Sequence, residues 1–223
     1  MNRLCCMTVM LIAGFCHAEV PKYTLKYGKA DLPTGTSKEL QAVLQTEAVQ
    51  VSDESGTGVL KIWFVRNVNS TASTDQVKNG LTYREWTEGS IVGIVQLEQP
   101  WVDYRKQTIA ADAYTLRIAF QPDTGDHKDT APGTEFLLLC PVEADSGTEA
   151  LATNDLVKLS KKATGADHPA VMLLLPPKNT GKTAELKSAD KALSLVLSLP
   201  VKTTDATGTV GVQAVVWGHS TKR

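Results

Sequence analysis

The sequence predicts a mainly β fold: a two-sheet β-sandwich of immunoglobulin-like or jelly-roll-like type, with two or three short helices in its connections. Two observations indicate this class. Short segments rich in β-branched, leucine and aromatic residues recur along the chain, and clusters of Gly, Pro, Asp, Asn, Ser and Thr separate them. We expect strands at residues 23–27, 48–52, 59–65, 91–97, 114–121, 135–141, 170–175, 193–201 and 210–217.

The clearest local element is a hairpin over residues 48–65. Val49 and Val51 alternate with polar neighbours, and Ser-Gly-Thr-Gly at 55–58 supplies a turn. Leu60, Ile62 and Phe64 then continue the alternation on the return strand. Further along, Tyr114 stands at the start of a strand, where its hydroxyl is expected to bond nearby backbone as a corner tyrosine.

Three segments have helical signals: residues 37–44, 73–79 and 154–163. The first two begin at a serine suited to an N-cap, and glycines follow the second and third segments. All three are short, so we expect them to be connections packed on a sheet.

The first 18 residues have the pattern of a secretory signal peptide. Met-Asn-Arg supplies one positive charge, an apolar run extends over 4–15, and Cys-His-Ala at 16–18 fits a cleavage site after Ala18. Roughly a dozen apolar residues are too few to span a bilayer, which needs about 20. We therefore expect an exported protein, periplasmic or extracellular, with one β-sandwich domain over residues 19–223.

Cleavage would change the cysteine and charge inventory. Of four cysteines only Cys140 would remain, in an apolar run that suggests a buried thiol, so no internal disulfide is expected. With Arg3 removed from the 23 basic side chains, the 24 acidic ones outnumber the remainder by two. This balance argues against nucleic acid as a partner, and no later segment is apolar enough to span a membrane.

One candidate binding site is a cluster of aromatic and charged residues: Trp86, Trp101, Tyr104 and Arg105. Aromatic rings beside charged groups can form a stacking platform for a carbohydrate or a protein partner. The alternative interpretation is that Trp101 and Tyr104 fill the sandwich core.

A second candidate is a divalent-metal site made by His127, His168 and His219 with Asp126, because all four lie in predicted loops or at strand ends. Their spacing matches no metal motif, so separate surface histidines are the alternative. We expect no other cofactor.

No Gly-x-Ser-x-Gly elbow occurs, and no catalytic triad can be assigned. The leading functional hypothesis is therefore a non-enzymatic binding protein for a ligand or partner. The alternative is a metal-binding protein or metal-dependent hydrolase.

Several phrases carry a resemblance to a known family: Gln-Val-Lys-Asn-Gly-Leu-Thr-Tyr-Arg at 76–84, Pro-Trp-Val-Asp-Tyr-Arg-Lys at 100–106, Phe-Gln-Pro-Asp-Thr-Gly-Asp-His at 120–127, His-Pro-Ala-Val-Met at 168–172 and Gly-His-Ser at 218–220. Through these phrases the chain resembles a family of uncharacterised exported β-rich proteins of planctomycete-type bacteria. The resemblance implies a shared fold and a bacterial exported location. It implies no activity for any residue.

Overall fold

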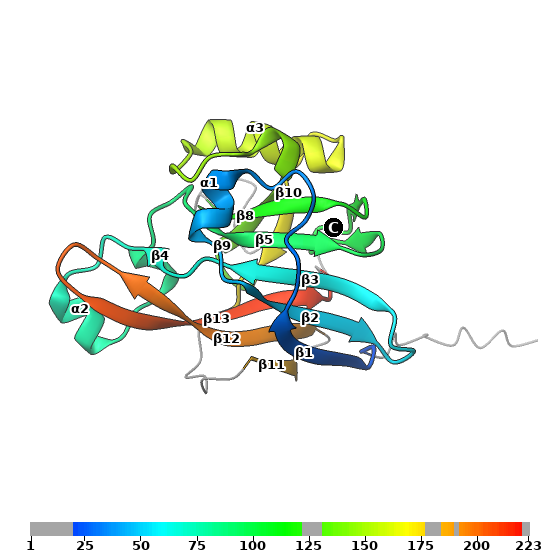
Figure 1. The fold of residues 1–223 in the computed structure, drawn as a ribbon, viewed down its shortest axis with the longest axis horizontal. Helices are drawn as coiled ribbons and strands as arrows, with labels where there is room; N and C mark the ends of the chain where they lie inside the picture. The colour runs from blue at the N-terminus through cyan, green and yellow to red at the C-terminus, as the bar shows by residue number, and fades with distance from the viewer. Residues whose placement is uncertain (1–19, 122–130, 177–183, 190–191, 220–223) are drawn as a thin grey trace, which may run out of the picture.

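The computed structural model describes residues 20–121, 131–176, 184–189 and 192–219. The chain folds into two main β-sheets packed face to face, with a longer helix across one face of the larger sheet and two short helices elsewhere (Figure 1). The predicted class, a mainly β two-sheet sandwich with a few helices, is confirmed. The predicted signal peptide, residues 1–18, lies outside the described residues.

The large sheet has seven antiparallel strands in the order β1-β2-β3-β5-β8-β9-β10. Each strand pairs with the preceding strand of this sheet along the chain, which makes the sheet a meander, whereas immunoglobulin-like and jelly-roll-like domains contain Greek-key connections. The strands are β1 (Tyr23–Lys29), β2 (Glu47–Asp53), β3 (Gly58–Phe64), β5 (Ile91–Leu97), β8 (Ala113–Phe120), β9 (Glu135–Pro141) and β10 (Ala170–Leu173).

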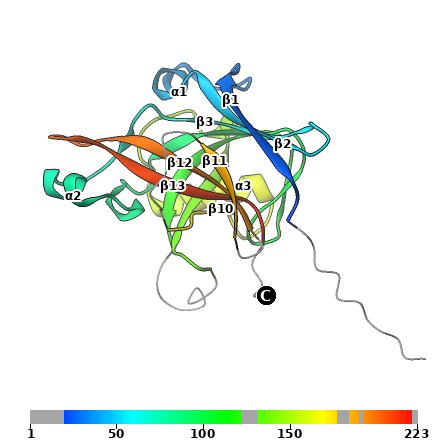
Figure 2. The same cartoon turned by 90° about the horizontal axis from the view of Figure 1, so that it is seen from below.

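The second sheet consists of β11 (Glu185–Ala189), β12 (Ala192–Lys202) and β13 (Thr207–Trp217), with β4 (Val68–Asn69) paired parallel to β12. The β12–β13 hairpin extends past the large sheet towards α2 (Thr74–Asn79), as Figures 1 and 2 show. A Cβ atom on Gly208 would lie 2.7 Å from Cγ1 of Val77, so only glycine fits this contact without a shift. A two-stranded ribbon of β6 (Trp101–Val102) and β7 (Thr108–Ile109) follows β5.

The large sheet is buried on both faces at β8, β9 and β10. Leu116, Leu137 and Met172 point into the core between the sheets, whereas Leu138 and Val171 belong to a second cluster beneath α3 (Thr153–Thr164). In Figure 1, α3 lies across the large sheet from the β12–β13 hairpin, which makes three layers here. A sheet covered on both faces reads as a continuous apolar run, as the segment 136–140 does.

The three predicted helices are confirmed within one or two residues. Ser37 caps α1 (Lys38–Val43) by accepting the N–H of Leu40, and Ser73 forms a capping box with Gln76 at α2. Two 3-10 turns, η1 (Tyr83–Glu85) and η3 (Val142–Ala144), complete the helical elements of the described residues. None of the helices described has the length and apolar character needed to cross a membrane.

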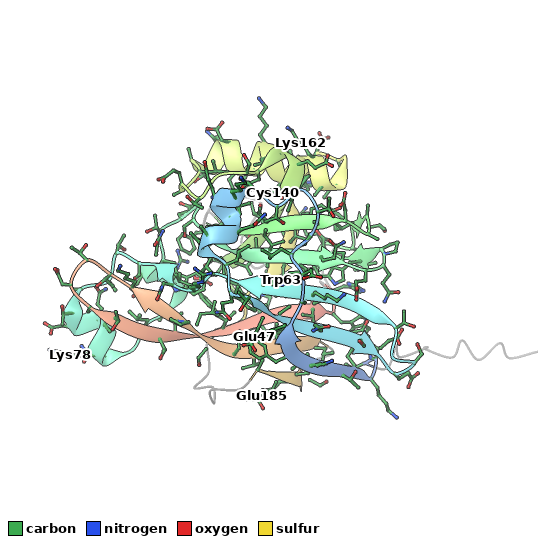
Figure 3. All side chains as sticks on the ribbon, viewed as in Figure 1. Glu47, Trp63, Lys78, Cys140, Lys162 and Glu185 are labelled. Carbon is green, nitrogen blue, oxygen red and sulfur yellow. The ribbon has the colours of Figure 1, made fainter. Side chains whose placement is uncertain are left out.

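Several local expectations also agree with the structure. Val49 of β2 pairs with Ile62 of β3, and a bulge follows Val51 before the turn. The Tyr114 hydroxyl donates to the carbonyl of Ala110 at 3.1 Å, so it acts as the expected corner tyrosine. Figure 3 shows Cys140 and Trp63 inside the packed layers, where Cys140 is fully buried.

Candidate functional site

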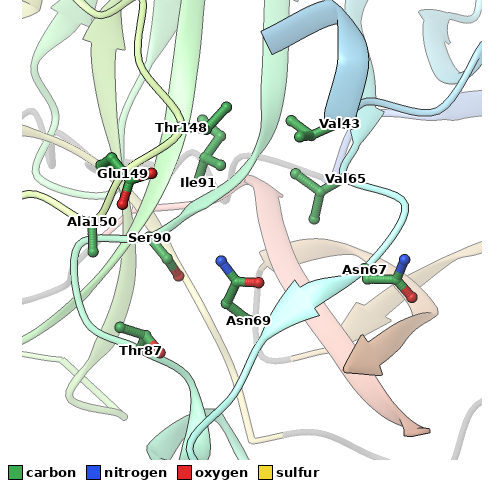
Figure 4. A pocket seen from close by; sticks show the side chains of 10 residues that line it. All are labelled: Val43, Val65, Asn67, Asn69, Thr87, Ser90, Ile91, Thr148, Glu149 and Ala150. Atoms are coloured by element: carbon green, nitrogen blue, oxygen red, sulfur yellow. The ribbon is translucent and has the colours of Figure 1, made fainter. Parts of the chain in front are cut away.

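A polar cavity of about 320 Å³ opens at one edge of the sandwich (Figure 4). Its lining comes from the end of α1, the link from β3 to β4, the segment before and at the start of β5, and the segment 148–150. This volume is at the lower end of the range of about 300–1,000 Å³ that is usual for small-molecule sites. The lining residues are Val43, Val65, Asn67, Asn69, Thr87, Ser90, Ile91, Thr148, Glu149 and Ala150.

The cavity has an apolar, buried side and a polar, exposed mouth. Val65, Ser90 and Ile91 are buried, whereas Asn69 and Glu149 are exposed. In Figure 4 the Asn69 amide and the Ser90 hydroxyl both point into the space between β4 and the 87–91 segment. A ligand here would meet Val65 and Ile91 at depth and hydrogen-bonding groups around them, in a lining that is more polar than that of most small-molecule sites.

The polar groups of the lining lack partners within the described part of the chain. The Ser90 side chain is only 1% exposed, yet its Oγ has no hydrogen-bond partner there. Buried polar atoms are rarely left in this state, because an unmade hydrogen bond costs about 1–3 kcal/mol. The side chains of Asn67, Asn69, Thr87 and Thr148 likewise form no side-chain hydrogen bond among the residues that the structure describes. These four side chains are exposed or partly exposed, so water satisfies them in the free protein and a ligand would replace that water.

Arg117 of β8 holds the walls of the cavity in place. Its guanidinium is fully buried and donates from Nε and Nη2 to the two carboxylate oxygens of Asp145, at 2.7 and 2.8 Å. Nη1 donates to the carbonyls of Gly89 and Glu149, both at 2.8 Å, and Nη2 also donates to that of Gly147 at 2.7 Å. All five N–H groups of the side chain are thereby used. One side chain ties together the two segments that carry Ser90 and Glu149.

Gly89 is required where these segments meet. Its φ of +79° lies in the left-handed region, and a Cβ atom there would lie 1.9 Å from the carbonyl oxygen of Leu151. The close approach is fixed by two backbone bonds, from Gly89 N to Ile118 O at 2.9 Å and from Leu151 N to Gly89 O at 3.2 Å. Because glycine has no Cβ atom, the backbone at Gly89 can pack directly against the backbone at Leu151.

The electrostatics of the cavity disfavour an anionic ligand. Among the described residues that line it, Glu149 is ionisable and there is no lysine, arginine or histidine. The guanidinium of Arg117 lies behind the wall and has no free N–H to offer. An anionic ligand would therefore find no cation in the lining to pair with, whereas a hydroxyl-rich neutral molecule would find hydroxyl and amide partners.

The structure buries the two tryptophans of the predicted aromatic platform. Trp86 is 2% exposed and packs edge-on against Tyr83, with ring centroids 5.3 Å apart. Trp101 is 7% exposed, and its Nε1 donates to the carbonyl of Val216 at 2.8 Å. Neither indole presents a face on which a sugar could stack, because both rings are buried. The alternative interpretation expected this of Trp101, whereas it did not include Trp86.

The other two members of that cluster remain accessible. Tyr104 is half-buried and Arg105 is exposed, both in the β6–β7 loop. His219 lies beside this loop, with its Nδ1 3.4 Å from the carbonyl oxygen of Asp103, and His168 is exposed at the entry to β10. The structure thus places His219 beside the loop that carries Tyr104 and Arg105.

The predicted metal site is only partly described. His127 and Asp126 lie outside the described residues. Within the described ranges, no group of three His, Cys, Asp or Glu side chains is arranged to hold a metal ion. The metal site stays a prediction, which elemental analysis of the purified protein tests.

Cys140 is placed as a structural residue. Burial raises the pKa of its thiol to about 12, and the negative charge of Asp145 adds to this increase. A thiol with such a pKa is not a nucleophile at neutral pH.

The fold and the cavity together define a β-sandwich with a polar pocket at its margin. Comparison of the chain with models of protein families, with curated proteins and with solved structures finds no match. The functional argument therefore depends on the geometry of the molecule itself.

Sequence reasoning missed both Ser90 and Arg117. A signal for Arg117 was present, since it is a single charged residue within the apolar strand Tyr-Thr-Leu-Arg-Ile-Ala-Phe. A charged residue in a strand of this kind is nearly always paired in the folded protein. No comparable signal marked Ser90, whose environment arises from segments distant in the sequence.

Proposed function

We propose that this chain is an exported, non-enzymatic binding protein that holds a small neutral, hydroxyl-rich ligand, of the size of a monosaccharide, in the cavity beside Ser90. The observation that carries the proposal is Ser90, a residue of the cavity lining whose hydroxyl is buried and unpartnered within the described residues. Its Oγ is covered in the free protein, so a ligand hydroxyl would supply the missing hydrogen bond once binding turns this side chain towards the cavity.

The remaining lining supports the same ligand class. Asn67 and Asn69 offer amide groups that can donate and accept, and Thr87 and Thr148 add hydroxyls. The buried side chains of Val65 and Ile91 fit the apolar C–H faces of a sugar ring. Among the described lining residues there is one carboxylate and no histidine or cysteine, whereas most hydrolases use an acid and a base together.

Export is the second part of the proposal. It is supported by the pattern of residues 1–18, in which a basic residue, an apolar run and a small residue follow one another. This part is tested independently by adding protease to intact cells and to cells whose outer membrane has been permeabilised. A periplasmic protein is cleaved only after permeabilisation.

Ligand binding is tested by isothermal titration calorimetry with a panel of neutral monosaccharides and disaccharides, together with a uronic acid as the anionic comparison. We expect a neutral sugar to bind and the uronic acid to bind more weakly. Ser90→Ala should weaken binding about tenfold, because one hydrogen bond to a buried group is lost. Ala150→Trp, at the exposed mouth, should block binding.

The matched control is Ser188→Ala, because Ser188 is an exposed serine of β11 and is not among the lining residues. It should leave the affinity unchanged. Failure of every neutral sugar to bind, or binding that Ala150→Trp leaves intact, would contradict the proposal.

A further inference from the structure

A second surface is built around the β6–β7 loop. The cavity contacts the large sheet at Ile91 of β5, whereas Asp103 anchors the loop to the backbone of Val171 in β10. Strands β5 and β10 are three places apart in the sheet, and neighbouring strands are about 4.8 Å apart, so about 14 Å of sheet separates the two attachment points. The two regions use different strands, and this inference does not depend on the proposed ligand of the cavity.

The β6–β7 loop is held rigidly by the buried carboxylate of Asp103. Oδ1 accepts the backbone N–H groups of Arg105 and Gln107 at 2.9 and 2.8 Å. Oδ2 accepts Nε2 of Gln107 at 2.9 Å and the backbone N–H of Val171 at 3.1 Å. Asp103 is 0% exposed, so these four bonds anchor the loop from within.

The anchored loop presents two exposed cations at its tip, Arg105 and Lys106. Lys106 has a φ of +67°, a left-handed conformation that is uncommon for a residue other than glycine. Its N–H donates to the Asp103 carbonyl at 2.9 Å, which stabilises this conformation. The loop is thus fixed before any partner binds, which lowers the entropic cost of binding.

Two other segments meet the loop. Gln107 Nε2 donates to the carbonyl of Pro169 at 3.0 Å, which places the exposed His168 next to the loop. The His219 ring, two residues after the end of β13, lies near the Asp103 carbonyl. Its centroid is 6.0 Å from that of the Trp217 ring. We call the resulting set the β6–β7 surface; it consists of Tyr104, Arg105, Lys106, His168, Trp217 and His219.

Positive charges predominate on and beside this surface. The cations are Arg105 and Lys106 on the loop and, in the last turn of α3 that leads towards His168, Lys161 and Lys162. Two carboxylates oppose them: Asp103, which is buried within the loop, and the exposed Asp167 next to His168. The rings of Tyr104 and Trp217 are half-buried.

We propose that the β6–β7 surface binds an acidic polysaccharide. Arginine and lysine pair with carboxylate or sulfate groups, and partly exposed aromatic rings fit the apolar faces of sugar rings. The chain as a whole has a net charge of −1, unlike a typical nucleic-acid-binding domain.

The experiment measures binding of the full mature chain to polygalacturonate, with neutral dextran and a single-stranded DNA of mixed sequence as comparisons, at low and high salt. We expect binding to polygalacturonate that weakens with salt, and no binding to dextran. The double variant Arg105→Gln/Lys106→Asn should weaken the affinity about tenfold. Asparagine is chosen at 106 because it tolerates a positive φ.

The matched control is Lys26→Gln/Lys29→Gln, which removes the same charge from two exposed positions on β1. It should retain the wild-type affinity, and the thermal midpoints of all variants should agree within a few degrees. Equal loss in the control would show that net charge alone is responsible and would overturn the proposal. DNA binding as tight as polygalacturonate binding would overturn it in favour of nucleic acid, and absence of binding to polygalacturonate would also overturn it.

Discussion

Replacing Arg117 by methionine is the sharpest test of how the cavity is held together. Methionine keeps an unbranched apolar side chain of similar length but removes all five N–H donors. The carboxylate of Asp145, which is 4% exposed, then retains the Thr115 hydroxyl as its side-chain partner. The carbonyls of Gly89, Gly147 and Glu149 lose their side-chain donor.

The expected loss of stability follows from this geometry. Removing one partner of a buried ion pair typically costs about 3–5 kcal/mol, because the remaining charge stays buried without compensation. We take about 4 kcal/mol, since the pair here is bidentate and its arginine is fully buried. That is a large share of the roughly 5–15 kcal/mol that stabilises a typical domain.

Urea unfolding followed by tryptophan fluorescence measures this loss. With a slope of about 2.5 kcal/mol per molar urea, the midpoint should fall by about 1.5 M. The double variant Arg117→Met/Asp145→Leu removes both charges and should recover part of the loss, because no unpaired carboxylate remains.

A loss below about 1 kcal/mol for Arg117→Met would refute the view that this pair anchors the walls. A double variant no more stable than Arg117→Met would refute the unpaired-charge explanation. Arg117→Met should also abolish sugar binding in the cavity, since the segments bearing Ser90 and Glu149 lose their common anchor.

Four further predictions concern stability, each measured by urea unfolding. Ser160→Ala should cost about 1–3 kcal/mol, because its buried hydroxyl donates to Leu139 O at 2.8 Å and accepts Ala170 N at 3.1 Å; a neutral effect would contradict these bonds. Gly89→Ala should cost at least about 2 kcal/mol through its left-handed φ and the clash with the neighbouring carbonyl. Tyr114→Phe should cost about 1 kcal/mol, and an unchanged midpoint would show that the corner bond contributes nothing. The pKa of Cys140 is raised from 9.0 to about 12 in the folded protein, so its contribution to stability is complete below pH 9 and falls as pH rises towards 12; Cys140→Ala should flatten this decline.

The fold was predictable from the sequence because its strands carry their own local signals. Residues 91–97 and 135–141 match β5 and β9 at both ends, since apolar runs between turn-forming residues mark each one. Strand β11 was missed because Glu-Leu-Lys-Ser-Ala is polar and short and lies at a sheet edge. The two-residue strands were missed because two residues establish no alternation.

The site was far less predictable, because no single segment contains it. Ser90, Asn69 and Thr148 are far apart in the sequence and line one cavity only in the folded protein. Tertiary packing therefore creates the site. Trp86 shows the opposite error: an aromatic residue among charged neighbours suggested a binding surface, although packing against Tyr83 buries it. Residues that are adjacent in the sequence therefore suggested a binding surface at Trp86, whereas its neighbours in the folded protein bury it.

The sequential order of the large sheet has a consequence for how this chain acquires its structure. Each strand of the large sheet pairs with the strand of the same sheet that precedes it along the chain. Pairing can therefore proceed from the N-terminus during synthesis. The parallel contact of Val68 with Val201 joins segments from opposite halves of the chain and must wait for the β12–β13 hairpin. We expect the formation of this parallel contact to be the slowest step of folding. A chain that is stalled before residue 192 would have the large sheet without the second sheet, so one apolar face of the large sheet would be exposed to solvent. We expect this intermediate to be the species most prone to aggregate.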